Sequence, residues 1–240
     1  MTCVAIIAAM PGELKPLVRG WARERRGKVE MWRWKFDEGE WVAACGGAGV
    51  DAATRTFAEI EKDGSPELVI SVGWAGALNA AMQTGGGYWV SGVTDARTGE
   101  RFRAANWSVE SWLVTSPIVA NEMEKQRLAS TYKADLVDME AAAIARLAQM
   151  RGIPFYCFKG VSDGFTDKLP DFNRFISPDG QFDLAGMVLF SILRPRYWPS
   201  LMRMGENSKK ASQSISEALL DFLDERATIR QRNGYPNLKS

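Results

Sequence analysis

The stretch CVAIIAAM at residues 3–10, followed by PGE at 11–13, is typical of a buried β-strand that ends in a turn. Its apolar residues are continuous and do not alternate with polar ones, which indicates a strand covered on both faces of a sheet. Similar apolar runs occur at residues 68–72 and 153–161. The sequence therefore predicts several buried strands, each followed by a loop at its carboxyl end.

Segments of helical composition separate these strands. The pattern predicts a hairpin over residues 30–44 and helices over 51–60, 122–132, 138–151 and 207–226. Strands that alternate with helices favour an α/β fold, here a single domain with a central mixed β-sheet flanked by helices. We assign residues 1–226 to this domain and residues 227–240 to a polar C-terminal tail.

The composition excludes several classes of protein. Of 240 residues, 46% are hydrophobic and 25% are charged, and the formal charge of +1 provides no overall attraction to nucleic acid or to an anionic membrane. The chain contains no histidine, which excludes Ser-His-Asp catalysis and histidine-ligated zinc. The three cysteines are far apart in the sequence, as expected of free thiols in a reducing compartment. The N-terminus lacks the basic region of a signal peptide and no apolar run is long enough to span a membrane, so we expect a cytoplasmic protein.

Ligands of α/β proteins bind beyond the carboxyl ends of the strands. This rule selects residues 10–13, 46–49, 73–76 and 162–163, with the start of the 138–151 helix as a fifth place. Glu13, Glu140 and Asp163 are then expected to meet in one cleft. Each also has an ordinary structural explanation, as a residue of a first helical turn or as a cap, so position alone does not assign a function.

Four motifs carry a more specific signal. These are IIAAMPGEL at 6–14, VGWAGAL at 72–78, VDMEAAA at 137–143 and KGVSD at 159–163. In this order, they resemble motifs of the nucleoside phosphorylase and nucleosidase family, in particular its methylthioadenosine/S-adenosylhomocysteine nucleosidases. The resemblance extends from about residue 4 to residue 223 and implies a nucleoside phosphorylase-like fold without a cofactor.

The resemblance also implies roles for the three carboxylates. Asp163, oriented by Ser162, would protonate the departing purine, because a base leaves more easily as a neutral molecule than as an anion. Glu140 would hold the ribose hydroxyls and favour the positive charge that develops on the sugar, with Met139 packed on the ring. Glu13 would accept a proton from the attacking water.

Other residues are expected to shape the pocket. The resemblance places Ile118 and Val119 against the base, which they would contact through backbone and apolar groups. Phe172 or Phe175 would form an apolar wall near the 5′ side of the substrate, although simple core packing explains either ring equally well. The remaining pocket residues implied by the motifs are Ala9, Trp74, Ala75 and Gly76.

The nucleophile is expected to be water. A phosphorylase surrounds phosphate with cations and amides, whereas the first loop here carries Glu13 and no arginine. Arg55 or Arg97 could still bind an anion, so phosphorolysis remains the alternative activity. Trp74 stands where the nucleosidases usually carry a small hydroxyl residue, and family members that act on futalosine or on hopanoid-linked adenosyl compounds show that the 5′ substituent varies.

Interpretations of the sequence outside this family have weaker support. GAGVDA at 47–52 fits a dinucleotide fingerprint, but no acidic residue ends the next strand. The basic and tryptophan-rich stretch 19–35 fits a nucleic-acid binder less well than a solvated helix face followed by a hairpin. Residues 193–203 mix basic and aromatic residues, which fits weak contact with a membrane surface but fits a surface loop better. We expect a small nucleoside substrate, no nucleic-acid partner and a homodimer, with a non-catalytic nucleoside-binding protein as the non-enzyme alternative.

Overall fold

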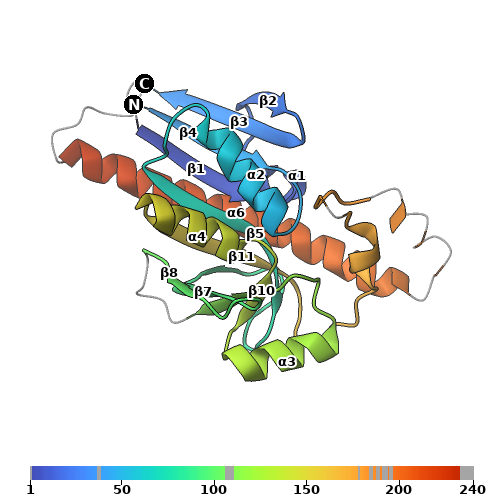
Figure 1. Ribbon diagram of the computed structural model, residues 1–240. Coiled ribbons are helices and arrows are strands. Elements are labelled where there is room, and N and C mark those ends of the chain that lie inside the picture. Colours follow the sequence, from blue (N-terminus) through green and yellow to red (C-terminus); the bar gives the residue numbers. More distant parts are fainter. Residues whose placement is uncertain are drawn as a thin grey trace.

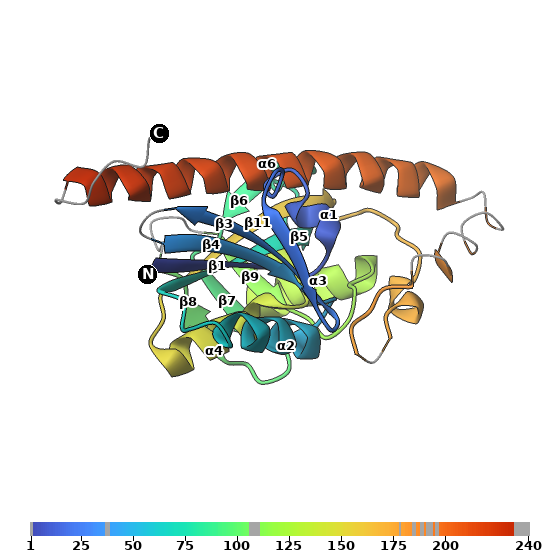
Figure 2. The same cartoon turned by 90° about the horizontal axis from the view of Figure 1, so that it is seen from above.

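The computed structural model describes residues 2–232, except 37–38, 106–110, 178, 184–185, 188–189, 191–193 and 195–196. Within these residues, eleven strands form one mixed β-sheet, and helices cover both of its faces (Figures 1 and 2). The predicted α/β domain with a central mixed sheet is confirmed. No helix in the described part of the chain is both long and apolar enough to cross a membrane.

The sheet is built from strands that are mostly short. They are β1 (Thr2–Ala8), β2 (Ala22–Arg26), β3 (Val29–Phe36), β4 (Gly39–Cys45), β5 (Leu68–Ala77), β6 (Gly87–Trp89), β7 (Gly92–Asp95), β8 (Arg101–Arg103), β9 (Trp112–Thr115), β10 (Leu136–Asp138) and β11 (Phe155–Asp163). The helices are α1 (Pro11–Leu14), α2 (Val50–Glu61), α3 (Glu122–Tyr132), α4 (Ala141–Arg151), the 3₁₀ helix η1 (Phe172–Phe175) and α6 (Trp198–Arg232).

Strand β5 is the centre of the sheet. It pairs in parallel with β1 and with β11, and its last residues pair in antiparallel with β10. The strand order on one side of β5 is β1, β4, β3 and β2, and on the other side β10, β9, β7 and β8. This arrangement brings the carboxyl ends of β1, β5, β10 and β11 to one region of the molecule.

The two faces of the sheet are covered differently. Helices α2 and α4 pack on one face, while α6 lies along the opposite face beside α1 (Figure 2). Helix α6 buries Ala211, Ile215, Leu219 and Leu223, which recur every fourth residue and therefore share one side of the helix. Gly160 permits the close approach of α6 to β11, because a Cβ atom at this position would lie 2.7 Å from the Cβ of Ala211.

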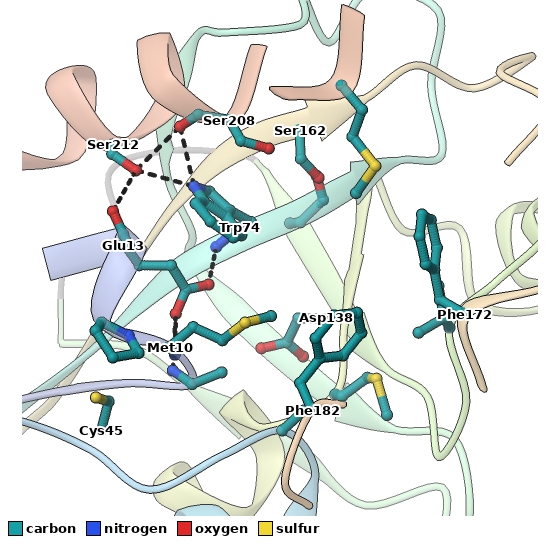
Figure 3. A pocket seen from close by; sticks show the side chains of 18 of the residues that line it. Met10, Glu13, Cys45, Trp74, Asp138, Ser162, Phe172, Phe182, Ser208 and Ser212 are labelled. Carbon is teal, nitrogen blue, oxygen red and sulfur yellow. Dashed lines mark hydrogen bonds between the residues drawn. The ribbon is translucent and has the colours of Figure 1, made fainter. Parts of the chain in front are cut away.

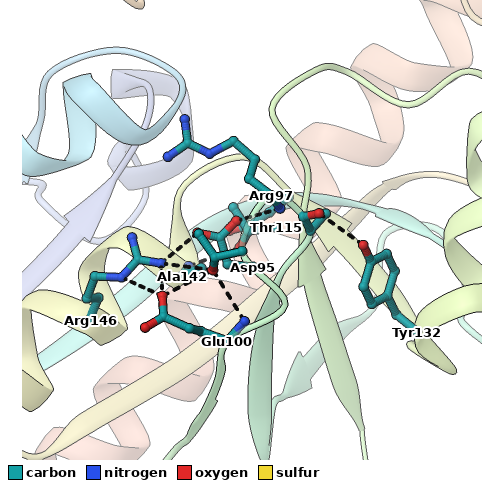
Figure 4. Close-up of polar contacts among 10 residues, drawn as sticks. Asp95, Arg97, Glu100, Thr115, Tyr132, Ala142 and Arg146 are labelled. Atoms are coloured by element: carbon teal, nitrogen blue, oxygen red, sulfur yellow. Dashed lines mark hydrogen bonds and ion pairs between the residues drawn. The ribbon is translucent and has the colours of Figure 1, made fainter.

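An ion-pair network fixes α4 against the sheet (Figure 4). Arg146 of α4 binds the carboxylates of Asp95 at 2.8 Å and Glu100 at 2.5 Å, which lie at or beside β7 and β8. Burial opposes the charged form of Asp95, but Arg146 and the backbone amide of Arg97 outweigh it and lower the pKa of Asp95. The network therefore ties the helix that follows Glu140 to the far strands of the sheet.

Three elements differ from the sequence prediction. The stretch before residue 30 forms β2, which pairs with β3 around Gly27 (φ +58°), rather than a solvated helix face. Residues 73–77 continue β5 instead of forming a turn after it. The predicted helix 138–151 begins at Ala141, because Asp138 ends β10 and its carboxylate accepts a hydrogen bond from the Ala141 amide.

The C-terminal segments also differ. Helix α6 is predicted over 207–226 but extends from Trp198 to Arg232, so it includes part of the segment assigned to a tail. Within the basic and aromatic segment 193–203, residues 193, 195 and 196 lie outside the described residues, and residues 198–203 form the first turns of α6. Residues 233–240 also lie outside the described part of the chain.

Candidate active site

A large cavity lies where the carboxyl ends of the central strands meet (Figure 3). Its volume is about 1260 Å³, and α1, α3, α6 and η1 contribute to its walls. The residues predicted for the site that line it are Ala9, Glu13, Trp74, Ala75, Gly76, Ile118, Val119, Met139, Glu140, Ser162, Asp163 and Phe172. Phe175 is the exception, because it is buried with its ring edge-on to Phe190 and is not part of the lining.

The carboxylate of Glu13 is held by three backbone amides. Its Oε2 accepts hydrogen bonds from Ala9 N at 2.8 Å and Met10 N at 2.7 Å, and its Oε1 accepts one from Trp74 N at 2.7 Å. Burial raises the pKa of Glu13, whereas these amides and the charge of Lys159 act in the opposite direction. Because each carboxylate oxygen accepts about two hydrogen bonds, Oε1 keeps one acceptor position for a further donor.

Gly73 makes this contact between β5 and Glu13 possible. Its φ of +137° lies in a region that favours glycine, and a Cβ atom here would lie 2.7 Å from Glu13 Oε1. The glycine thus lets the backbone amide of Trp74 approach the carboxylate. The GWAG sequence at 73–76 serves the site through the backbone as much as through the indole ring.

The indole of Trp74 is anchored to α6. Its Nε1 donates to Ser208 O at 3.1 Å and to Ser212 Oγ at 3.0 Å, and the Ser212 hydroxyl lies 3.1 Å from Gly12 O (Figure 3). A Cβ atom on Gly12 would meet the indole ring at 3.0 Å. Trp74 therefore fills the space between the Glu13 loop and α6 and joins the two.

Glu140 is placed by the start of α2. Its Oε1 accepts a hydrogen bond from Gly49 N at 2.7 Å, and Gly49 precedes α2 with a φ of +88°. Burial and the neighbouring charge of Asp138 raise the pKa of Glu140 to about 8. The charge of Lys159 and the amide of Gly49 act in the opposite direction and favour the carboxylate.

A buried ion pair lies beneath Glu140. Lys159 of β11 binds Asp138 at 2.9 Å, and both side chains are almost fully buried. Burial opposes the charge on Lys159, but Asp138, Cys157 and Glu140 outweigh this effect and raise the pKa of the lysine. The pair supplies the counter-charge that a cluster of buried carboxylates requires.

A β-bulge orients Asp163. The register of β11 against β5 shifts between Val161 and Asp163, so that Ser162 is an extra residue opposite Ala75 and Gly76. The Ser162 hydroxyl donates to Asp163 Oδ1 at 2.6 Å. The bulge thus allows two adjacent residues, Ser162 and Asp163, to lie together at the cavity.

The sequence analysis missed Lys125, which lies against Asp163. It comes from α3, its side chain is 1% exposed, and its Nζ donates to Asp163 Oδ2 and, at 2.6 Å, to Gly164 O. A signal was present, because Lys125 precedes the buried Leu128 by three residues and so shares its helix face. Lys159 also had a signal in the sequence, because it is a lysine inside an otherwise apolar strand.

Asn173 of η1 was also missed, and it contacts the predicted base-binding residue Val119. Asn173 Oδ1 accepts a hydrogen bond from Val119 N at 2.7 Å, and Asn173 Nδ2 donates to Val119 O at 3.1 Å. Ile118 is 46% exposed at the edge of the same loop. The polar edge of this wall of the cavity is therefore occupied by a side chain of the protein itself.

The two arginines considered as anion ligands lie elsewhere. Arg55 donates to the carbonyl oxygens of Gly46 and Asp179 at 2.8 and 3.0 Å, and Arg97 belongs to the β7–β8 connection. Neither arginine lines the cavity. Among the described residues, no group of three or more cysteine, aspartate or glutamate side chains is arranged to hold a metal ion.

Comparison with known proteins adds the family. The sequence matches the profile of the phosphorylase superfamily over residues 4–86 and 96–194. The chain belongs to the phosphorylase superfamily. Its predicted relation to the nucleoside phosphorylase and nucleosidase family is therefore confirmed. No curated protein sequence matches this superfamily member.

Solved structures of nucleosidases share its fold. A 5′-methylthioadenosine/S-adenosylhomocysteine nucleosidase from Helicobacter pylori has a TM-score of 0.69 and 16% identity, covering 93% of this chain and 98% of that one. Futalosine hydrolase of Helicobacter pylori has a TM-score of 0.69 and 15% identity, covering 93% of this chain and 98% of that one. A 5′-methylthioadenosine nucleosidase from Arabidopsis thaliana has a TM-score of 0.66 and 18% identity, covering 91% of this chain and 95% of that one. At these identities, the likeness shows a common fold.

Proposed function

We propose that this member of the phosphorylase superfamily is a purine nucleosidase that hydrolyses the N-glycosidic bond of an adenosine-type nucleoside. The observation that carries the proposal is the meeting of Glu13, Glu140 and Asp163, from three distant segments, at one cavity. Each carboxylate has different partners, which is the arrangement expected when each has a different chemical task. Methylthioadenosine and S-adenosylhomocysteine are the first substrates to test.

The reaction assigns one step to each carboxyl group. Asp163 passes a proton to the purine as the bond between C1′ and the base breaks and its electron pair moves to the base. Glu140 binds the ribose hydroxyls and stabilises the positive charge on the sugar. Water adds to C1′ from the opposite side and gives its proton to Glu13, whose Oε1 keeps one acceptor position.

The lining favours water over phosphate as the nucleophile. Among the described residues, the hydrogen bonds to the Glu13 carboxylate come from three backbone amides and none from an arginine, and the two buried lysines, Lys125 and Lys159, are each paired with a carboxylate. A phosphate dianion placed near Glu13 would be repelled. Because the lining also includes cations, phosphorolysis is the second candidate, with non-catalytic nucleoside binding as the third; these cations are Lys15, Arg19, Arg25, Lys28 and Lys209.

The size of the cavity bears on the 5′ substituent. Its volume of about 1260 Å³ is larger than the roughly 300–1,000 Å³ of an ordinary small-molecule pocket. Phe172, Phe182, Leu201 and Met204 give part of the lining an apolar character. These features support a nucleoside with a substituent larger than a methylthio group.

Two further properties belong to the proposal. A cytoplasmic location fits the three cysteines, which are free thiols. A homodimer fits the exposed apolar side chains of Ile118, which precedes α3, and Met123, which belongs to α3; they are 46% and 76% exposed. Light scattering coupled to size-exclusion chromatography tests the dimer.

The activity test is chromatographic detection of free base. Purified protein is mixed with methylthioadenosine, S-adenosylhomocysteine, adenosine, inosine or futalosine, with and without phosphate. Release of adenine without phosphate supports the nucleosidase, and release that requires phosphate identifies a phosphorylase and removes the assigned role of Glu13. Asp163→Asn is expected to abolish release, with circular dichroism establishing that the variant is folded, whereas Asp167→Asn, which retains an acceptor for Gly164 N, is the matched control.

A further inference from the structure

Lys125 is a buried cation in direct contact with the acid of the proposed reaction. Its side chain is 1% exposed, and two of its three N–H groups donate to Asp163 and to Gly164 O. Among the described residues, the third N–H has no acceptor, and Lys125 itself lines the cavity. The ammonium group therefore faces both Asp163 and the space that a base would occupy.

The fold makes room for this pair. A Cβ atom on Gly76 would lie 3.0 Å from Asp163 Oδ2 and 3.1 Å from Lys125 Cε. Burial of a lone ammonium costs several kcal/mol, so the contact with a carboxylate is a condition for placing a lysine here. Three separate elements therefore contribute to this contact, through Gly76 of β5, Lys125 of α3 and Asp163 of β11.

Both oxygens of Asp163 are bound by donors. Asp163 Oδ1 accepts from the Ser162 hydroxyl, and Oδ2 accepts from Lys125. A carboxyl group that accepts at both oxygens has the arrangement of a carboxylate. In this arrangement, the proton that a departing purine requires is on Lys125.

We propose that Lys125 supplies the proton that Asp163 passes to the leaving base, an inference that rests on the proposed nucleosidase function. As the C1′–N bond breaks and its electron pair moves to the base, a proton moves from Lys125 Nζ to Asp163, which passes it to the base nitrogen. Lys125 becomes a neutral amine, Asp163 remains a carboxylate and the purine departs as a neutral molecule. The proton that Glu13 takes from water returns to Lys125 through solvent after the products leave.

The test compares two leaving groups in the full-length protein. Adenine from S-adenosylhomocysteine needs a proton, whereas 4-nitrophenol from 4-nitrophenyl riboside departs as a stable anion. Lys125→Arg keeps a cation and hydrogen-bond donors but holds its proton firmly at neutral pH. We expect adenine release to fall about 10²–10⁴-fold, the usual size of acid catalysis, while nitrophenol release stays within a few-fold of wild type.

A second variant tests the proton apart from the charge. Lys125→Ala should also lose adenine release, and methylammonium should restore it, whereas guanidinium, a cation that does not give up its proton, should not. Arg127→Ala removes an exposed cation from the same helix and is the control for both substrates. Circular dichroism and thermal unfolding establish that each variant is folded.

The outcomes are distinct. An equal loss of both leaving groups would mean that Lys125 merely holds Asp163 in place, and unchanged adenine release would mean that it has no role; either result overturns the proposal. Rescue by guanidinium as effective as rescue by methylammonium would also overturn it. If the wild-type protein releases neither leaving group, the proposed function fails and the role of Lys125 fails with it.

Discussion

The side-chain amide of Asn173 makes two hydrogen bonds with the backbone of Val119: its Oδ1 accepts from the N–H at 2.7 Å, and its Nδ2 donates to the C=O at 3.1 Å. The Watson–Crick edge of adenine offers the same adjacent donor and acceptor. A base that forms hydrogen bonds with the backbone of Val119 would therefore have to displace Asn173, which occupies these backbone groups in the free protein.

Removal of this side chain should improve binding. For Asn173→Ala, we expect the KM for the nucleoside to fall by about tenfold, because the substrate no longer has to displace an internal partner. Steady-state kinetics checks this, with Arg174→Ala on the same 3₁₀ helix as the control. A higher KM would show that Asn173 contacts the substrate instead.

A side chain at Gly73 should reduce activity through its contact with Glu13, and a second glycine separates this effect from backbone strain. Gly73→Ala places a methyl group against Glu13 Oε1, whereas Gly64→Ala, at the similar φ of +133°, meets nothing within 4 Å. Both variants should lose about 1–2 kcal/mol of stability from backbone strain. We expect Gly73→Ala alone to lose activity, by about 10²-fold, through displacement of the carboxylate. Equal activities in the two variants would contradict the assigned geometry.

Glu140 should make stability depend on pH. Its pKa rises from an ordinary value of 4.5 to about 8 in the folded state, through burial and the charge of Asp138. The folded protein therefore binds a proton that the unfolded chain releases, so the contribution of Glu140 is present below pH 4.5 and is lost as the pH rises to 8. Urea unfolding between these limits should show falling stability for wild type and a shallower fall for Glu140→Gln. Identical slopes would contradict the raised pKa.

The indole of Trp74 should matter more for stability than for chemistry. Trp74→Phe loses the hydrogen bonds from Nε1 to Ser208 and Ser212 but keeps the backbone amide that binds Glu13. We expect a loss of about 1 kcal/mol in the free energy of unfolding, with kcat within a few-fold of wild type. Trp34→Phe, at a ring that is 46% exposed, is the control. A large loss of kcat would place the indole in the reaction itself.

The sequence predicts the frame of the site better than its interior. Apolar runs and the residues that follow them locate the loops of Glu13 and Asp163, because a buried strand and its carboxyl end have a local pattern. The partners of these residues have no such pattern. Asn173 reaches Val119 from a segment 54 residues away, and its composition gives no indication of that contact.

The errors have physical causes as well. Gly73 resembles a turn residue in the sequence, but in the structure it continues β5, since pairing with β11 holds the strand through an unusual φ. Glu140 resembles a residue of the first helical turn, but the carboxylate of Asp138 caps α4 and leaves Glu140 outside the helix. In both cases, a contact between distant segments overrides the local preference.

The extra residue in β11 has a consequence for how related chains are compared. If Ser162 were deleted, the strand would become regular, and Asp163 would follow Val161 directly, still opposite Gly76 but without the hydroxyl that donates to its Oδ1. The acid would remain in the sequence but would lose the donor that orients it. An alignment that matches the aspartate and ignores the spacing of the strand would therefore treat as equivalent two acids of which only one is oriented by a neighbouring serine. For this chain, the number of residues between Val161 and the end of β11 carries as much information as their identities.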